Sequence, residues 1–190
     1  MTESILTQSK ATLVKGVTLW FTGLPSSGKS TLARQLERQF RKWQIKTELL
    51  DGDVVRTHLS KDLGFSREDR DTNIKRIAFV CQLLTRNDVA AIASFVSPYR
   101  DAREGARRMI GNFVEIYVKT SLAECEKRDV KGLYKKARAG EIKGMTGVND
   151  PYEEPANPDI LIETEKETPE HSLEKILKRL EDFGYLKGHK

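Results

Sequence analysis

The sequence has 190 residues, 38% of them hydrophobic, with 33 Lys and Arg against 28 Asp and Glu and a net charge of +5. This length allows one buried core, so we expect a single domain over residues 1–190. No apolar run approaches the roughly 18 residues that span a membrane, and the polar residues 1–15 lack the apolar stretch of a secretory signal. The two cysteines, Cys81 and Cys125, are typical of free thiols in the cytoplasm, where we expect the protein to be.

A phosphate-binding pattern is the first motif along the chain. Residues 17–22 read as a buried strand, and the loop that follows fits G-x-x-x-x-G-K-[ST] at residues 23–30. From Lys29 onward, apolar residues such as Leu32 and Leu36 recur at helical spacing. A turn between strand and helix aims backbone N–H groups at one anion. We therefore predict a nucleoside triphosphate site in which Lys29 contacts the β- and γ-phosphates and the Ser30 hydroxyl holds Mg²⁺.

The rest of the chain alternates between strand-like and helix-like patterns. We expect strands at residues 46–50, 89–96, 113–118 and 160–162, and helices at residues 70–87, 101–110, 121–128 and 173–183. Pro151, Pro155 and Pro158 mark an extended connector, and residues 188–190 are expected to fray. This alternation predicts an α/β fold with a mostly parallel sheet flanked by helices in three layers.

Two polar loops follow predicted strands and are expected to lie beside the phosphate-binding loop, because ligands of such sheets bind outside the carboxyl ends of the strands. Asp51 and Asp53 follow the second strand, where one carboxylate can accept a hydroxyl proton while the other orients the acceptor or contacts metal-bound water. An ordinary Asp-Gly turn is the alternative interpretation. Ser97 lies in the other loop without a nearby His or Cys to activate it, so a hydrogen bond to the acceptor is its more economical role.

Charged residues after Asp53 are candidates for the acceptor side. Arg56 and Arg70 lie nearest to it, and Asn73 is one helical turn beyond Arg70. Phe65 either belongs to the core or stacks on a base, and a lone aromatic is more often core.

A basic segment lies farther along the chain. Residues 127–143 hold seven Lys and Arg but only two acidic residues, with glycines interspersed. This composition suits a lid that closes over phosphates, although a solvated basic helix has the same composition. The three histidines form no metal-spaced set.

Taken in order, these motifs resemble the adenylylsulfate kinase (APS kinase) family. The resemblance runs from about residue 15 to residue 186, with a lid at about residues 129–149. The phosphate loop by itself indicates only a P-loop NTPase fold, whereas the acceptor loops and the lid are more specific. The motifs are G-L-P-S-S-G-K-S-T at residues 23–31, L-D-G-D at 50–53, L-G-F-S at 63–66, D-R at 69–70, N-I at 73–74, S-P-Y-R at 97–100, R-D-V-K-G-L-Y-K-K-A-R at 128–138, G-E-I-K-G at 140–144 and P-Y-E at 151–153.

The resemblance implies transfer of the γ-phosphoryl group of ATP to the 3′-hydroxyl of adenosine 5′-phosphosulfate, with Mg²⁺ as cofactor. The implied catalytic residues are Lys29, Asp51, Asp53 and Ser97, the last being the family's phosphoserine position. The implied ATP-binding residues are Gly23, Leu24, Pro25, Ser26, Ser27, Gly28, Lys29, Ser30, Thr31 and Arg128. The implied acceptor-binding residues are Asp51, Asp53, Arg56, Phe65, Arg70, Asn73, Ser97, Arg100, Lys131 and Leu133.

Some features qualify this interpretation. Val54 stands where the family usually has Asn, which removes an amide contact from the acceptor loop, and no sulfurylase domain is present. Because Ser97 lacks an evident base, we expect direct transfer to the acceptor. A kinase for a sugar or nucleoside and a nucleotide-gated regulatory protein are the alternatives. The family resemblance implies a homodimer, and we expect neither nucleic acid nor membrane as a partner.

Overall fold

A parallel five-stranded sheet forms the centre of the computed structural model, which describes residues 10–188. The strand order is β3-β4-β2-β5-β6, and every neighbouring pair is parallel. The strands are β2 (Val17–Thr22), β3 (Thr47–Asp51), β4 (Ala90–Ser94), β5 (Phe113–Lys119) and β6 (Ile160–Glu163). Two further short strands, β1 (Thr12–Leu13) and β7 (Leu186–Lys187), pair antiparallel with each other. The frayed end expected at residues 188–190 and the polar start at residues 1–15 lie partly outside the described residues.

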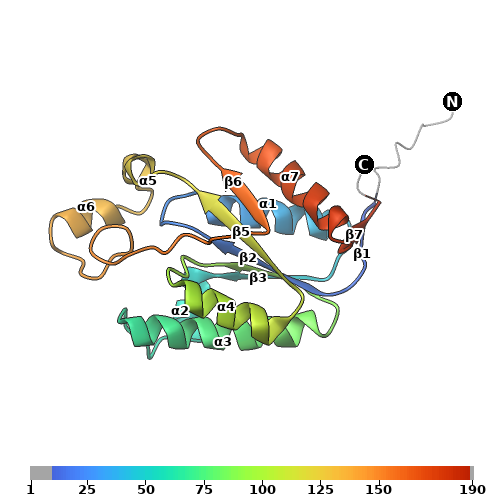
Figure 1. The fold of residues 1–190 in the computed structure, drawn as a ribbon, viewed down its shortest axis with the longest axis horizontal. Helices are drawn as coiled ribbons and strands as arrows, with labels where there is room; N and C mark the ends of the chain where they lie inside the picture. The colour runs from blue at the N-terminus through green and yellow to red at the C-terminus, as the bar shows by residue number, and fades with distance from the viewer. Residues whose placement is uncertain (1–9, 189–190) are drawn as a thin grey trace.

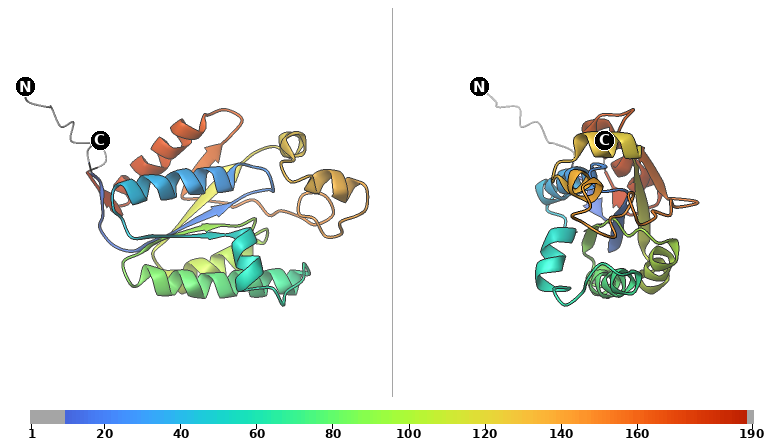
Figure 2. Two further views of the ribbon diagram at one scale, coloured as in Figure 1. Left: turned by 180° about the vertical axis from the view of Figure 1, so that it is seen from behind. Right: turned by 90° about the vertical axis from the view of Figure 1, so that its left-hand side faces the viewer.

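Helices cover both faces of the sheet (Figures 1 and 2). On one face lie α1 (Lys29–Lys42) and α7 (Pro169–Asp182), and on the other lie α3 (Arg67–Thr85) and α4 (Arg100–Ile110). The shorter helices are α2 (Gly52–His58), α5 (Leu122–Arg128) and α6 (Leu133–Arg138). The predicted three-layer α/β fold is therefore confirmed. Within residues 10–188, no helix has the length and apolar character needed to cross a membrane.

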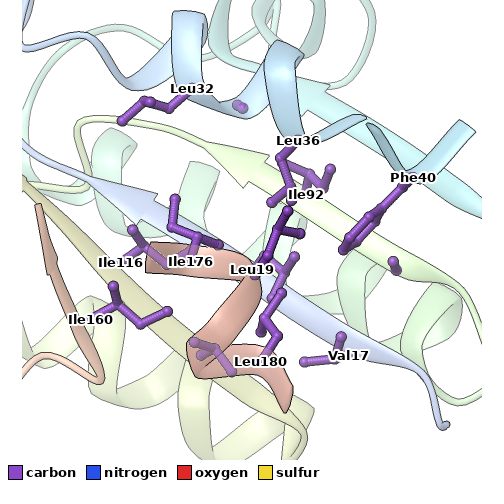
Figure 3. Packing of buried hydrophobic residues seen from close by; sticks show 14 of the residues in the cluster. Val17, Leu19, Leu32, Leu36, Phe40, Ile92, Ile116, Ile160, Ile176 and Leu180 are labelled. Atoms are coloured by element: carbon purple, nitrogen blue, oxygen red, sulfur yellow. The ribbon is translucent and has the colours of Figure 1, made fainter. Parts of the chain in front are cut away.

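Alternating side chains of the central strand supply two separate cores. Leu19 of β2 lies in the core with Leu36 of α1 and Ile176 of α7 (Figure 3), and Phe21 belongs to the same cluster. Trp20, between Leu19 and Phe21 in sequence, joins the core beneath α3 and α4. A strand buried on both faces needs apolar or hydrogen-bonded residues at every position, as the sequence of β2 provides. This packing fixes the carboxyl end of β2, where the phosphate loop begins.

The structure differs from the sequence-based expectation around Asp53. Gly52–His58 is helix α2, so Asp53 lies in a helical first turn and not on an extended segment parallel to Asp51. The side chain of Asp51 caps this helix by accepting a hydrogen bond from the Asp53 N–H at 3.1 Å. Helix α3 also begins three residues earlier than expected, because the Ser66 hydroxyl caps it through the Asp69 N–H.

Candidate active site

The phosphate loop, residues 23–30, connects β2 to α1 at the carboxyl edge of the sheet. Its backbone takes conformations that L-residues rarely adopt, with φ of 62° at Ser26 and 102° at Gly28. Gly28 is the N-cap of α1, so the first free N–H groups of that helix open onto the loop. Such a loop and helix end form an anion site built from backbone N–H groups and the helix dipole.

Lys29 lies buried beneath this loop and is held by it. Its Nζ donates hydrogen bonds to the carbonyl oxygens of Gly23 at 2.9 Å and Leu24 at 2.6 Å. Burial lowers the pKa of Lys29 from 10.5 to about 8, while the neighbouring Cys125 and Asp51 act in the opposite direction. The charge of Asp51, at the end of β3, therefore acts on Lys29.

Threonines at the ends of β5 and β6 hold the other side of the loop. The hydroxyl groups of Thr120 and Thr164 both donate to the Ser27 carbonyl, at 3.1 and 3.2 Å. Arg128 donates to the Thr164 hydroxyl at 2.9 Å and to Glu124 at 3.0 Å, so its guanidinium lies next to the loop. Arg128, predicted to lie beside the base of ATP, is thus brought to the phosphate-loop side of the site.

The two aspartates of the acceptor loop have different surroundings. Asp51 is buried, and besides capping α2 it lies 3.7 Å from the Arg34 guanidinium. Asp53 is exposed and forms an ion pair with Lys131 of the lid, residues 129–149. The buried carboxylate faces Lys29 and the exposed one faces the lid, so the two carboxylates have distinct roles available to them.

Two of the predicted acceptor-side residues, Arg56 of α2 and Arg70 of α3, lie against the ring of Phe65. Phe65 is 65% exposed, which excludes the core interpretation. The Arg56 guanidinium lies 4.4 Å from the centre of its ring, and Arg70 lies 5.9 Å from it. Asn73 is buried, and its Oδ1 accepts no hydrogen bond from any residue within 10–188. An exposed aromatic ring, two guanidinium groups and a free amide oxygen suit an anionic ligand with a flat polar base.

The predicted lid segment contacts this acceptor side. Arg70 donates to the Thr146 hydroxyl at 3.0 Å and to the Gly144 carbonyl, and just beyond the segment Tyr99 donates to the Asp150 carboxylate at 3.1 Å. Lys131 and Leu133 lie at the start of the lid, on either side of Gly132. The lid also has its own small core, here called the lid cluster, which consists of Cys125, Tyr134, Ala137 and Met145 packed with Leu24, Leu122, Leu133, Ile142 and Val148.

Ser97 is brought to the same edge of the sheet, but its hydroxyl points into a buried network. The Trp20 indole N–H donates to Ser97 Oγ at 3.1 Å, and Ser97 Oγ donates to the Thr22 hydroxyl at 3.1 Å. The backbone of Ser97 has a φ of 39°. Arg100 is exposed at the start of α4, where it donates to the Glu154 carbonyl at 3.0 Å. Of this loop's two predicted residues, Arg100 is the exposed one.

The matches to known proteins agree with this geometry. A model of the adenylylsulphate kinase family matches residues 15–163. The chain belongs to the adenylylsulphate kinase family. The adenylyl-sulfate kinase of Rippkaea orientalis is 58% identical to it over 172 residues, which are 90% of this chain and 95% of the relative. The adenylyl-sulfate kinase of Halothermothrix orenii is 56% identical over 172 residues, which are 90% of this chain and 93% of the relative.

A solved APS kinase shows that the fold is shared as well. The APS kinase of Mycobacterium tuberculosis, in complex with AMPPNP and APS, has a TM-score of 0.85 and 39% sequence identity. The match covers 88% of this chain and 98% of the mycobacterial chain. Residues 15–163, which the family model matches, include the phosphate loop, the acceptor side and the lid segment.

Residues that the sequence pattern did not single out also hold this kinase site together. Arg103 of α4 is fully buried and donates to Glu115 at 2.8 Å, to the Ser97 carbonyl at 2.6 Å and to the Glu153 carbonyl at 2.7 Å. Thr120 and Thr164 were also missed. The helical spacing of Arg103 with the buried Ala106 and Ile110 is a signal that could have found it, since all three lie on the sheet-facing side of α4.

Two cavities adjoin the site. The larger, about 840 Å³, meets the phosphate loop only at Leu24 and is otherwise lined by the ends of β5 and β6 and residues 147–154. The smaller, about 340 Å³, lies on the acceptor side between Arg56, Ser60 and Phe65. The charges of Asp51 and Lys131 act on Lys29, and none of these three residues lines either cavity.

Proposed function

We propose that this chain transfers the γ-phosphoryl group of ATP to the 3′-hydroxyl of adenosine 5′-phosphosulfate (APS), giving 3′-phosphoadenosine 5′-phosphosulfate and ADP. The observation that carries this proposal is that the lid contacts both sides of the site, through the Lys131–Asp53 ion pair and through the hydrogen bond from Tyr134 to the Pro25 carbonyl. The lid thereby joins the phosphate loop to the acceptor side, where donor and acceptor can react. Membership of the adenylylsulphate kinase family supplies the identity of the acceptor.

In this proposal the nucleotide lies on the phosphate loop. Lys29 exchanges its carbonyl partners for phosphate oxygens and stabilises the charge that develops on the transferred group. Arg128 packs beside the base. The residues that contact ATP are Gly23, Leu24, Pro25, Ser26, Ser27, Gly28, Lys29, Ser30, Thr31 and Arg128.

The oxygen donors of the site fit Mg²⁺. Ser30 is exposed in the first turn of α1, next to the predicted phosphates. Residues 10–188 contain no group of three His, Cys, Asp or Glu that could enclose a metal ion. Mg²⁺ at kinase sites typically takes one or two protein oxygens, and phosphates and water complete its shell. The Ser30 hydroxyl would hold the ion, which would neutralise phosphate charge and orient the γ-phosphoryl group.

Asp51 is the proposed base for the acceptor hydroxyl. It is buried beside Lys29 and held by the Asp53 N–H and Arg34, so its carboxylate has a fixed direction. Asp53 and Lys131 close over the acceptor from α2 and the lid. The other proposed acceptor contacts are Arg56, Phe65, Arg70, Asn73, Ser97, Arg100 and Leu133.

The proposed transfer is direct. Ser97 Oγ is engaged by Trp20 and Thr22, and neither neighbour is a base that could remove its proton. Its proposed contribution to the acceptor is to shape the loop that ends at Arg100. Ser97 as a phosphoserine intermediate would require the buried network to open.

We further propose that the described chain is one kinase domain, with a core at about residues 15–186 and the lid at about residues 129–149, and that it acts as a homodimer in the cytoplasm. Both cysteines are buried free thiols, which suits a reducing compartment. The exposed Phe79 and Met109 lie on α3 and α4, which pack together and offer an apolar surface for a second copy.

The function is tested by measuring ADP release with Mg-ATP in the presence and absence of APS, with the nucleotide product identified by mass. The expected result is APS-dependent ADP release and a product that carries one added phosphate on the 3′ position. ADP release that is independent of APS, or that depends only on a sugar or nucleoside, would contradict the proposal.

Asp51→Asn sharpens this test. The substitution keeps the size and the cap of α2 but removes the proton acceptor, so kcat should fall about 100-fold or more while ATP binding changes little. The matched control is Asp62→Asn, because Asp62 is an exposed aspartate that pairs with Arg76 on α3. Equal activity of the two variants would remove Asp51 as the base.

A further inference from the structure

A hydroxyl group of the lid donates a hydrogen bond to the phosphate loop. Tyr134, in lid helix α6, donates a hydrogen bond from its OH to the Pro25 carbonyl at 3.0 Å. The Tyr134 side chain is only 2% exposed and its ring packs in the lid cluster, which includes Leu24 of the phosphate loop. The hydroxyl thus has one fixed position relative to the loop.

This hydrogen bond determines the direction of the peptide group between Pro25 and Ser26. The chain has no cis peptide among residues 10–188, so the Pro25 carbonyl and the Ser26 N–H point in opposite directions. Because the carbonyl is held from the lid side, the Ser26 N–H is turned away from the lid cluster. That N–H donates to no backbone or side-chain acceptor within residues 10–188, whereas the next one, of Ser27, donates to the Leu24 carbonyl at 3.2 Å.

The conformation that Ser26 needs for this is strained. Its φ of 62° is in the left-handed region, which a serine adopts only when its surroundings hold it there. Loss of the Tyr134 hydrogen bond would let the peptide group between Pro25 and Ser26 rotate. The Ser26 N–H would then no longer be preset for an anion.

The other loop carbonyls are held by different groups. Lys29 holds those of Gly23 and Leu24, and Thr120 and Thr164 hold that of Ser27. When a phosphate chain draws the Lys29 ammonium toward itself, the Gly23 and Leu24 carbonyls lose that donor. The Pro25 carbonyl keeps its own, because the donor comes from the lid.

We infer that Tyr134 is a positioning residue for nucleotide binding, whose hydroxyl sets the Ser26 N–H toward the phosphates of ATP and ADP when the lid is closed. The inference rests on the proposed binding of ATP at the phosphate loop. The lid segment that carries Tyr134 also carries Lys131, and Asp129 fixes the start of α6 by accepting hydrogen bonds from the N–H groups of Tyr134 and Lys135 at 3.0 Å. Closure of the lid on the acceptor side therefore also presets the phosphate loop.

The test compares Tyr134→Phe with the wild type by titration with ADP and by steady-state kinetics. Loss of one hydrogen bond to a loop carbonyl should weaken ADP binding about three- to tenfold and raise the KM for ATP by the same factor. The KM for APS should stay within about twofold, since the ring and the lid cluster remain. The Tm of the variant should fall by no more than about 4 °C, which shows that it folds.

Tyr185→Phe is the matched control, because Tyr185 is a partly buried tyrosine that follows α7 and whose ring faces Lys15. It should bind ADP as the wild type does. ADP binding by Tyr134→Phe within twofold of the wild type, or an increase confined to the KM for APS, would overturn the inference. The ADP titration is independent of the acceptor, so a wild type that binds ADP without APS-dependent turnover would contradict the proposed function and still test Tyr134.

Discussion

At the scale of single residues, Lys29 shows how burial prepares a charged group for its ligand. Its ammonium lies under the phosphate loop and donates to two loop carbonyls, and burial lowers its pKa to about 8. The groups whose charge acts on it are Cys125, Asp51 and Lys131. A phosphate chain binds only the charged form well, so nucleotide affinity and the protonation of Lys29 must be linked.

This linkage predicts that ADP binding weakens as the pH rises through about 8. In the free protein Lys29 loses its proton above this pH, whereas bound phosphates keep Lys29 protonated. The Kd for ADP should therefore rise about tenfold between pH 7 and pH 9. Isothermal titration at several pH values measures the effect. The Lys29→Arg variant keeps its positive charge over this range. It should bind ADP more weakly than the wild type, with a Kd that does not change with pH. The same slope in both proteins would show that another group titrates.

Ser97→Ala tests whether the serine is a chemical or a structural residue. Its Oγ accepts from Trp20 and donates to Thr22, so alanine leaves the buried Trp20 N–H without an acceptor. We expect a loss of about 1–3 kcal/mol in the free energy of unfolding, with kcat retained within about tenfold. Urea unfolding and the kinase assay measure both.

A second buried serine provides the control for this substitution. Ser172 of α7 is also buried, but its Oγ has no hydrogen-bond partner within residues 10–188, so Ser172→Ala should leave stability nearly unchanged. A folded Ser97→Ala protein with at least a thousandfold lower kcat would instead favour an obligatory phosphoserine.

At the scale of helices and strands, local sequence patterns predicted the elements of the central sheet and its long helices. They failed where tertiary contacts determine whether a segment is helical. The strand β2 and the helix α1 were predictable because apolar residues recur at the right periods. Helix α2 was missed because Gly52, Val54 and Val55 all disfavour a helix by propensity. The Asp51 cap and the burial of Val55 override that preference. The earlier start of α3 was readable, since Ser66 and Asp69 have capping spacing.

Arg103 of α4 has a role that only the packed structure reveals, because its partner Glu115 lies on β5. This buried ion pair gives a prediction about stability. Burial raises the pKa of Glu115, and the adjacent Arg103 guanidinium opposes this shift. Arg103→Leu would remove the 2.8 Å ion pair of this buried carboxylate and leave it the longer 3.6 Å contact with Arg107, and it would leave the Ser97 and Glu153 carbonyls without their donor. The free energy of unfolding should fall by about 3–5 kcal/mol, as measured by urea unfolding.

Two variants check the origin of that loss. Arg103→Leu combined with Glu115→Leu should recover part of it, because no charge is then left unpaired. Arg108→Leu, on the exposed side of the same helix, should change stability by no more than about 0.5 kcal/mol. Equal losses from Arg103→Leu and Arg108→Leu would show that the buried ion pair contributes nothing specific.

At the scale of the whole molecule, the sequence indicated that a lid exists but not how it closes. The contacts that close it join residues 76 positions apart, from Arg70 to Thr146, and 109 apart, from Tyr134 to Pro25. Periodicity reports only on neighbours along the chain, so the partners of Arg70 and Tyr134 could not be read from it. Resemblance to a family supplied candidate residues, and the fold supplied their arrangement around one site.

These contacts make the lid sensitive to both ligands. Tyr134 and Leu24 connect it to the nucleotide side, and Lys131 and Arg70 connect it to the acceptor side. The Lys131–Asp53 pair is exposed and adds little stability by itself, so each bound ligand should restrict the lid further. The lid also presents exposed trypsin sites at Lys135, Lys136, Arg138 and Lys143.

We therefore predict that ADP and APS together slow tryptic cleavage in the lid on the order of tenfold, and that either ligand alone slows it less. Mass spectrometry of the fragments over time measures each cut separately. Cleavage at Lys46, an exposed residue between α1 and β3 on the far side of α1 from the phosphate loop, is the internal control and should not respond. Full protection by ADP alone would show that the lid is fixed through the phosphate loop and that its acceptor-side contacts follow closure without contributing to it.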